Sequence, residues 1–150
     1  MVQKKKQIKK TLYNSFVNNF ILKGKKKTAK SLIDITLLNL SRSSNTSLVQ
    51  LLFKIYFNLD YFIEIKQVKI KRRTYTIPFA ISYSRRIYLI IKKIKSAVSS
   101  DKRKIPFSEK LKFELYNILN LTNTSKALKL VKTNQSLVRS SRSNIHFRWK

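Results

Sequence analysis

Positive side chains dominate the groups in this sequence that could do chemistry. The 150 residues include 34 Lys and Arg but 6 Asp and Glu, which gives a formal net charge of +28. Lys71, Arg72 and Arg73 are consecutive, and like charges about 6 Å apart repel by ~0.7 kcal/mol even in water. A polyanion relieves such repulsion because it supplies phosphates and releases counterions. The charge therefore predicts a nucleic-acid partner rather than a merely solvated surface.

The cations gather in runs, and aromatic residues lie among them. Lys and Arg contact phosphates, while exposed aromatic rings stack on unpaired bases. Tyr75 has the alternative of packing inward from a strand, and Trp149 that of anchoring the C-terminus on the helices. The cationic runs are Lys4–Lys6 with Lys9–Lys10, Lys23–Lys30, Lys66–Arg73, Arg85–Lys95 and Lys102–Lys104. The candidate RNA-binding residues are Lys23, Lys25, Lys26, Lys27, Lys66, Lys69, Lys71, Arg72, Arg73, Tyr75, Arg85, Arg86, Lys102, Arg103, Lys104, Arg139, Arg142, Arg148 and Trp149.

Catalytic chemistry has few residues to draw on. There is no cysteine, and His146 is the only histidine, so thiol chemistry, zinc sites and histidine-based triads are excluded. One glycine cannot form a phosphate-cradling loop. The scattered acids are Asp34, Asp60, Glu64, Asp101, Glu109 and Glu114. We therefore expect no enzyme, no metal and no cofactor.

Apolar residues at helical spacing predict six helices that must hold these cations. The predicted ranges are Thr11–Leu22, Thr28–Leu40, Leu48–Leu59, Arg85–Val98, Ser108–Leu121 and a sixth helix that Thr124 or Ser125 opens. Gly24 follows the first helix, where a left-handed cap is favoured. Asn45 or Ser47 is the predicted cap of the third helix, and Ser84 that of the fourth. The third is apolar on most sides, which predicts a central, buried helix.

Alternating residues predict a β-hairpin between the third and fourth helices. Tyr75, Ile77 and Phe79 follow the period of a half-buried strand. In the preceding strand the apolar phase switches, which predicts a bulge near Lys66–Gln67. The two strands place Lys71, Arg72 and Arg73 at the tip of an exposed arm.

The fold class is thus mainly α: a six-helix domain with one protruding β-hairpin arm between the third and fourth helices. Residues 1–10 are predicted to form a basic N-terminal arm and 11–150 a single RNA-binding domain, with the hairpin arm at about 63–82 and a basic C-terminal tail at about 139–150. No apolar run approaches the ~18–20 residues that span a bilayer. The basic start lacks the apolar stretch of a secretory signal.

Four motifs in collinear order resemble the universal small-subunit ribosomal protein family number seven. They are Lys23-Gly24-Lys25-Lys26, Tyr75-Thr76-Ile77-Pro78, Ser82-x-Ser84-Arg85-Arg86 and His146-Phe147-Arg148-Trp149. The resemblance implies a structural protein that binds small-subunit ribosomal RNA in the head and helps to nucleate head assembly. It further implies neighbouring ribosomal proteins as partners and a hairpin arm near the exit-site tRNA and the mRNA. Neither a membrane partner nor a homo-oligomer is expected.

Two departures from the family pattern remove glycines. Lys71-Arg72 replaces the usual glycine pair near the hairpin tip, and 122–126 replaces a glycine-rich loop before the last helix. Codon bias offers a reason, because the chain is rich in residues with A/T-rich codons and has one glycine and two prolines. This composition favours an organelle-encoded protein of a mitochondrial ribosome, with a plastid ribosome as runner-up. The alternative function is that of an organelle nucleoid protein that binds or bends DNA.

Overall fold

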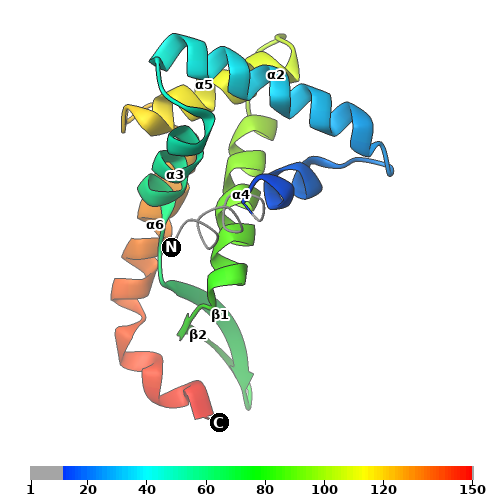
Figure 1. The fold of residues 1–150 in the computed structure, drawn as a ribbon. Helices are drawn as coiled ribbons and strands as arrows, with labels where there is room; N and C mark the ends of the chain where they lie inside the picture. Colours follow the sequence, from blue (N-terminus) through cyan, green and yellow to red (C-terminus); the bar gives the residue numbers. More distant parts are fainter. Residues whose placement is uncertain (1–11, 150) are drawn as a thin grey trace, which may run out of the picture.

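A computed structural model describes residues 12–149, so the predicted basic arm over 1–10 lies outside the described part (Figure 1). Residues 12–20 form the first helix. The other elements are α2 (Lys26–Ser44), α3 (Leu48–Leu59), β1 (Ile63–Ile70), β2 (Arg73–Ala80), α4 (Tyr83–Ser99), α5 (Phe107–Leu119), α6 (Lys126–Ser140) and the 3-10 helix η1 (Arg142–Trp149). The predicted mainly-α fold with a hairpin between the third and fourth helices is confirmed.

The helices form an elongated body with the hairpin at one end. Figure 1 shows α2 and α5 at the end opposite the hairpin, with α3, α4 and α6 running between the two ends. α5 is the central helix, since it packs against α2, α3, α4 and α6. Its residues Leu111, Leu115 and Ile118 are fully buried. Such a centre fixes the positions of the surrounding helices because close-packed interiors deform little.

The predicted central position of α3 is wrong. Only Leu51, Ile55 and Leu59 of this helix are buried. Phe57 is 81% exposed and Phe53 is 37% exposed, so α3 has an outer face that no other element between residues 12 and 149 covers. Apolar content on all sides indicates a buried helix in most proteins, but here part of it lies on the surface.

The hairpin is regular, and the predicted bulge is wrong. Pairing runs without interruption from Ile63 opposite Ala80 to Ile70 opposite Arg73. The apolar phase switches because the two faces of β1 have different neighbours. Ile65 lines a hollow beside α6 on one face, whereas Val68 on the other face pairs with Tyr75, which packs on η1.

Four of the predicted helix boundaries are tested by backbone geometry and hydrogen bonds. Gly24 has φ of +73°, but it lies in a turn closed by the hydrogen bond from the Lys25 N–H to the Leu22 carbonyl, four residues beyond the end of the first helix, so it is not the cap of that helix. The side chains of Ser47 and Ser125 accept hydrogen bonds from the backbone N–H of Gln50 and Leu128, which confirms both caps. Ser84 is not a cap, because α4 begins one residue earlier.

The N-cap of α4 is Ser82, and its side chain makes no capping hydrogen bond. Both Ser82 and the predicted Ser84 lie at this boundary, and the N-cap is the serine directly before Tyr83.

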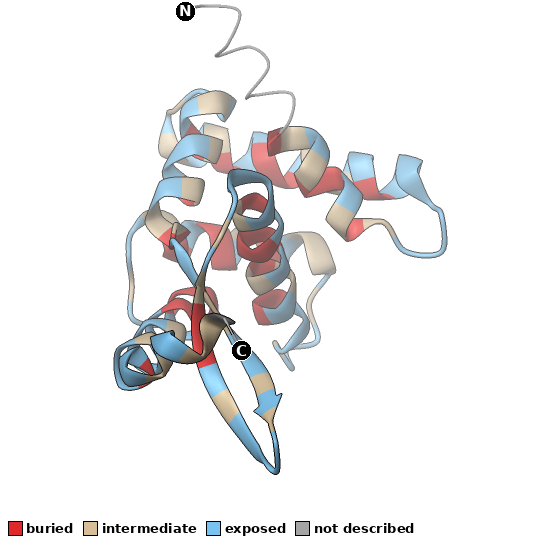
Figure 2. Ribbon diagram, turned by 90° about the horizontal axis from the view of Figure 1, so that it is seen from below, coloured by how far each residue is buried: buried red, intermediate tan, exposed pale blue. Residues whose placement is uncertain are grey.

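The C-terminal segment that the sequence marks as polar and basic packs along the hairpin. η1 contacts β2, and the side-chain amide of Asn144 donates to the carbonyl of Thr76. Ile77 and Pro78 are buried, while the tip remains pale blue and tan in Figure 2. The hairpin therefore protrudes as an arm only in its outer part, near the tip, which η1 does not cover. Within residues 12–149, no helix has both the length and the hydrophobicity needed to cross a membrane.

Candidate nucleic-acid interface

The hairpin tip presents its cations to solvent. Lys69, Lys71, Arg72 and Arg73 are all exposed, and none of them has an ion-pair partner among residues 12–149. Lys71 adopts φ of +54°, so the two-residue turn is made without the glycines usual in the family. The tip thus presents four charges within five residues at the end of a two-stranded ribbon.

A second group of exposed cations surrounds the start of α2. Lys23, Lys25, Lys26 and Lys27 are exposed, and Lys25 at the N-cap provides no side-chain acceptor for the first turn. Free N–H groups and the helix dipole favour an anion at this position. Lysines in the first turn oppose the dipole, so a bound phosphate would offset an unfavourable arrangement.

Sequence reasoning missed these backbone donors because it began α2 at Thr28. The available signal was the run of lysines at 25–27, where Ser, Thr, Asp or Asn would otherwise cap a helix.

Arg85 and Arg86 at the start of α4 are held by carboxylates. Arg85 forms a two-pronged pair with Glu64, at 2.9 and 3.3 Å, and its side chain is 49% exposed. Glu64 raises the pKa of the Arg85 guanidinium. Arg86 pairs with Asp60 at 3.2 Å, and its side chain is 15% exposed. The ring of Phe62 lies 4.4 Å from its guanidinium. Arg86 is therefore a structural residue, whereas Arg85 keeps a free edge.

The remaining predicted cations also divide into those bound within the fold and those exposed without an ion-pair partner. Arg103 pairs with Asp101, and Arg148 donates a hydrogen bond to the carbonyl of Pro78. The guanidinium lowers the pKa of the Asp101 carboxyl to about 2. Exposed and without ion-pair partners in the described part of the chain are Lys102, Lys104, Arg139 and Arg142.

The predicted aromatic contacts are partly used by the fold. Tyr75 is half-buried with its ring centroid 4.6 Å from that of Phe147, which is the inward packing considered as its alternative. The ammonium of Lys66 lies 5.0 Å from the ring centroid of Phe79. The side chain of Trp149 lies outside the described part of the structure.

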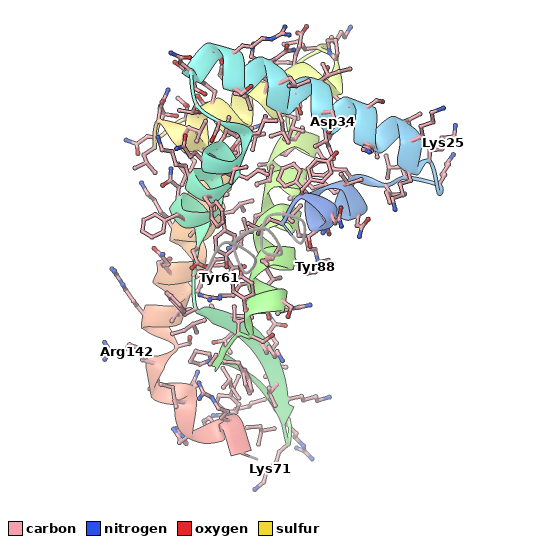
Figure 3. The ribbon with its side chains drawn as sticks, in the orientation of Figure 1. Lys25, Asp34, Tyr61, Lys71, Tyr88 and Arg142 are labelled. Carbon is pink, nitrogen blue, oxygen red and sulfur yellow. The ribbon has the colours of Figure 1, made fainter. Side chains whose placement is uncertain are left out.

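The predicted cations are brought to two ends of the molecule rather than to one site. Figure 3 shows Lys71 and Arg142 near the hairpin end, with Lys25 at the distant tip of the α2 side. Rigid helices separate the two groups. A ligand that reaches both must be long, which an RNA satisfies and a small molecule does not.

One acidic side chain, Glu114, joins two helices. Glu114 is buried and accepts hydrogen bonds from the Ser125 hydroxyl and the Ala127 backbone N–H, at 2.7 and 2.9 Å. Its carboxylate thereby joins α5 to the N-terminus of α6. No cluster of three acidic or histidine side chains suited to a metal occurs between residues 12 and 149.

Comparison with known proteins agrees with this geometry. The family model described as ribosomal protein S7p/S5e matches residues 1–142, and so ends before the His146–Trp149 motif. The small ribosomal subunit protein uS7 of Thermosipho africanus is 27% identical over 138 residues, covering 92% of this chain and 87% of that protein. The protein of the same name from Fervidobacterium nodosum is 28% identical over the same shares. That from Syntrophus aciditrophicus is 27% identical over 94% of this chain and 88% of its own length. The match covers nearly the whole chain, which therefore belongs to the ribosomal protein S7p/S5e family, whose members are structural ribosomal proteins and not enzymes.

Proposed function

We propose that this chain is a structural constituent of the small ribosomal subunit that binds small-subunit ribosomal RNA through both cationic ends. The family match and the names of the relatives support the subunit. The observation that supports RNA binding is that few Lys and Arg side chains have ion-pair partners within the fold. Residues 12–149 hold 28 of the 34 Lys and Arg, and within them the structure has three ion pairs. Phosphates would supply counter-charges to the exposed cations that have no ion-pair partner there.

The position within the particle is a further part of the proposal. The family resemblance supports a place in the head, where the chain binds early and nucleates assembly. The hairpin tip would then lie near the exit-site tRNA and the mRNA, and neighbouring small-subunit proteins would contact the body. We infer one copy per particle and no homo-oligomer.

The cellular location is proposed from composition. The relatives named above are bacterial and 27–28% identical. This chain combines that distance with residues of A/T-rich codons, one glycine and two prolines. We propose an organelle-encoded protein of the mitochondrial ribosome, with the plastid ribosome second.

An affinity comparison tests the RNA proposal. In moderate salt the purified protein should bind a head fragment of small-subunit ribosomal RNA more tightly than unrelated RNA of equal length. Replacing both Arg72 and Arg73 with Ala should weaken binding and reduce the salt slope by about 1.5, since each phosphate contact contributes ~0.7–0.9. The thermal midpoint should not change, because tip residues rest on no core.

The control is Lys54→Ala, which removes an exposed cation of α3 that belongs to neither cationic group. Equal affinity for the two RNAs would overturn the proposal, as would an equal loss of binding in the control. Tighter binding to duplex DNA of the same length would favour the nucleoid alternative.

A further inference from the structure

A hollow lies at the end of the molecule opposite the hairpin. It is lined by residues of α2, the 101–106 loop and α5. We term it the α2–α5 pocket, and its volume is about 500 Å³. Its lining includes Asn39, Arg103, Ile105, Glu109, Lys112 and Tyr116. Pockets of this size hold small organic groups, and a nucleotide is such a group.

Two aromatic rings form part of the wall of the α2–α5 pocket. Phe113 and Tyr116 stand three residues apart on α5, so their side chains share one face of the helix. Both residues are 47% exposed, although α5 is otherwise the central helix of the fold. The guanidinium of Arg103 lies 4.3 Å from the Phe113 ring centroid and supports that ring from one side. Exposed rings held in this way are suited to stacking.

The charges around the pocket favour an anion. Arg103, Lys110 and Lys112 line it together with one carboxylate, that of Glu109. Asp101 forms an ion pair with Arg103, and its backbone carbonyl accepts a hydrogen bond from the Lys110 ammonium. Lys112 has no ion-pair partner among residues 12–149. Aromatic surface beside an unpaired cation matches a base with its attached phosphate better than it matches an apolar peptide.

We propose that the α2–α5 pocket receives one unpaired base of the bound RNA, stacked on Tyr116 and Phe113, with its phosphate beside Lys112. This inference rests on the proposed RNA-binding function and adds to it a contact that reads single-stranded structure. Duplex RNA keeps its bases stacked and cannot supply one. The hairpin tip, which offers charge alone, makes no such distinction.

Two RNA probes with the same number of phosphates separate the contributions. One is a short single-stranded RNA and the other is a duplex. Phe113→Leu and Tyr116→Leu in the full chain should each weaken single-strand binding about tenfold and leave duplex binding unchanged. The salt slope should stay at the wild-type value because no phosphate contact is removed. The tip variant lacking Arg72 and Arg73 should lose affinity for both probes alike.

Phe57→Leu is the matched control, because it removes an even more exposed ring on α3, outside the pocket. The inference is overturned if the pocket variants bind the single strand like wild type, or if Phe57→Leu weakens it equally. Loss of a protein neighbour from the particle with RNA binding intact would also overturn it, in favour of a protein-docking surface. If wild-type protein binds neither probe, the proposed function itself fails.

Discussion

Arg72 and Arg86 carry the same side chain in different surroundings. Arg72 stands on the two-residue turn of the hairpin with no ion-pair partner in the described part of the chain, whereas Arg86 lies between Asp60 and the ring of Phe62. Sequence reasoning grouped the two because charge and motif were the only available signals. Asp60 is 26 residues away along the chain, so its approach to Arg86 is a tertiary event that spacing alone does not predict.

Replacing Arg86 with Ala should destabilise the fold. The substitution leaves the mostly buried carboxylate of Asp60 unpaired, which costs about 3 kcal/mol of unfolding free energy. Chemical denaturation measures the loss. Arg72→Ala is the comparison and should stay within about 0.5 kcal/mol of wild type. An Arg86→Ala protein of normal stability would show that the ion pair is not a structural element.

Lys93 gives a pH dependence that can be assigned to one residue. Its ammonium lies 3.9 Å from the ring centroid of Tyr61 and is buried without a hydrogen-bond partner in the described part of the chain. Burial lowers the pKa of Lys93 from 10.5 to about 8, and Glu64 partly opposes the shift. Between these two values the unfolded chain binds more protons than the folded one. The Lys93 contribution to stability therefore rises as pH increases through this range.

Lys93→Met should accordingly raise the thermal midpoint at pH 7 by a few degrees. The difference from wild type should shrink as pH approaches 10, where the folded lysine is neutral. Lys92→Met, which changes an exposed neighbour on the same helix, should show no such trend. A constant difference across this pH range would contradict the assignment.

Among the elements, helices were predicted well and their neighbours poorly. The spacing of Leu111, Leu115 and Ile118 was enough to predict α5, because periodicity reports that one face of a segment is apolar. It does not report what covers that face. For this reason the apolar pattern of α3 led to a wrong prediction of a central position. The phase switch along β1 led to a wrong prediction of a bulge, although it reflects different neighbours on the two faces of the strand.

Caps show the same limit. Ser125 was predicted from its local position before α6, but the second acceptor at that N-terminus is Glu114, on the preceding helix. A carboxylate that arrives from another element leaves no signal in the spacing around the helix that it caps.

Glu114→Ala should therefore loosen the junction of α5 and α6. The Ser125 hydroxyl and the Ala127 N–H would lose their acceptor in a buried site, at a cost of about 2–3 kcal/mol of unfolding free energy. Glu109→Ala is the control, since it removes an exposed carboxylate from the same helix at a cost of about 0.5 kcal/mol or less. Equal losses in the two variants, measured by urea unfolding, would exclude the capping role.

At the scale of the whole molecule, helices α3, α4 and α6 run between two charged ends (Figure 1). The nature of the partner could be predicted from composition, since +28 in 150 residues requires anions. The division of the cations could not, because it depends on which of them the few acids neutralise after folding. It also depends on the uncapped backbone at the start of α2, for which the lysines at 25–27 were the only local signal.

The central claim is that small-subunit ribosomal RNA neutralises these two ends in the native particle. Ultraviolet crosslinking of isolated small subunits, followed by identification of the joined residues and nucleotides, measures this most directly. The predicted result is crosslinks from the hairpin tip and from residues 23–27 to separate segments of small-subunit ribosomal RNA. A chain that sediments apart from ribosomal particles, or that crosslinks to DNA instead, would contradict the account.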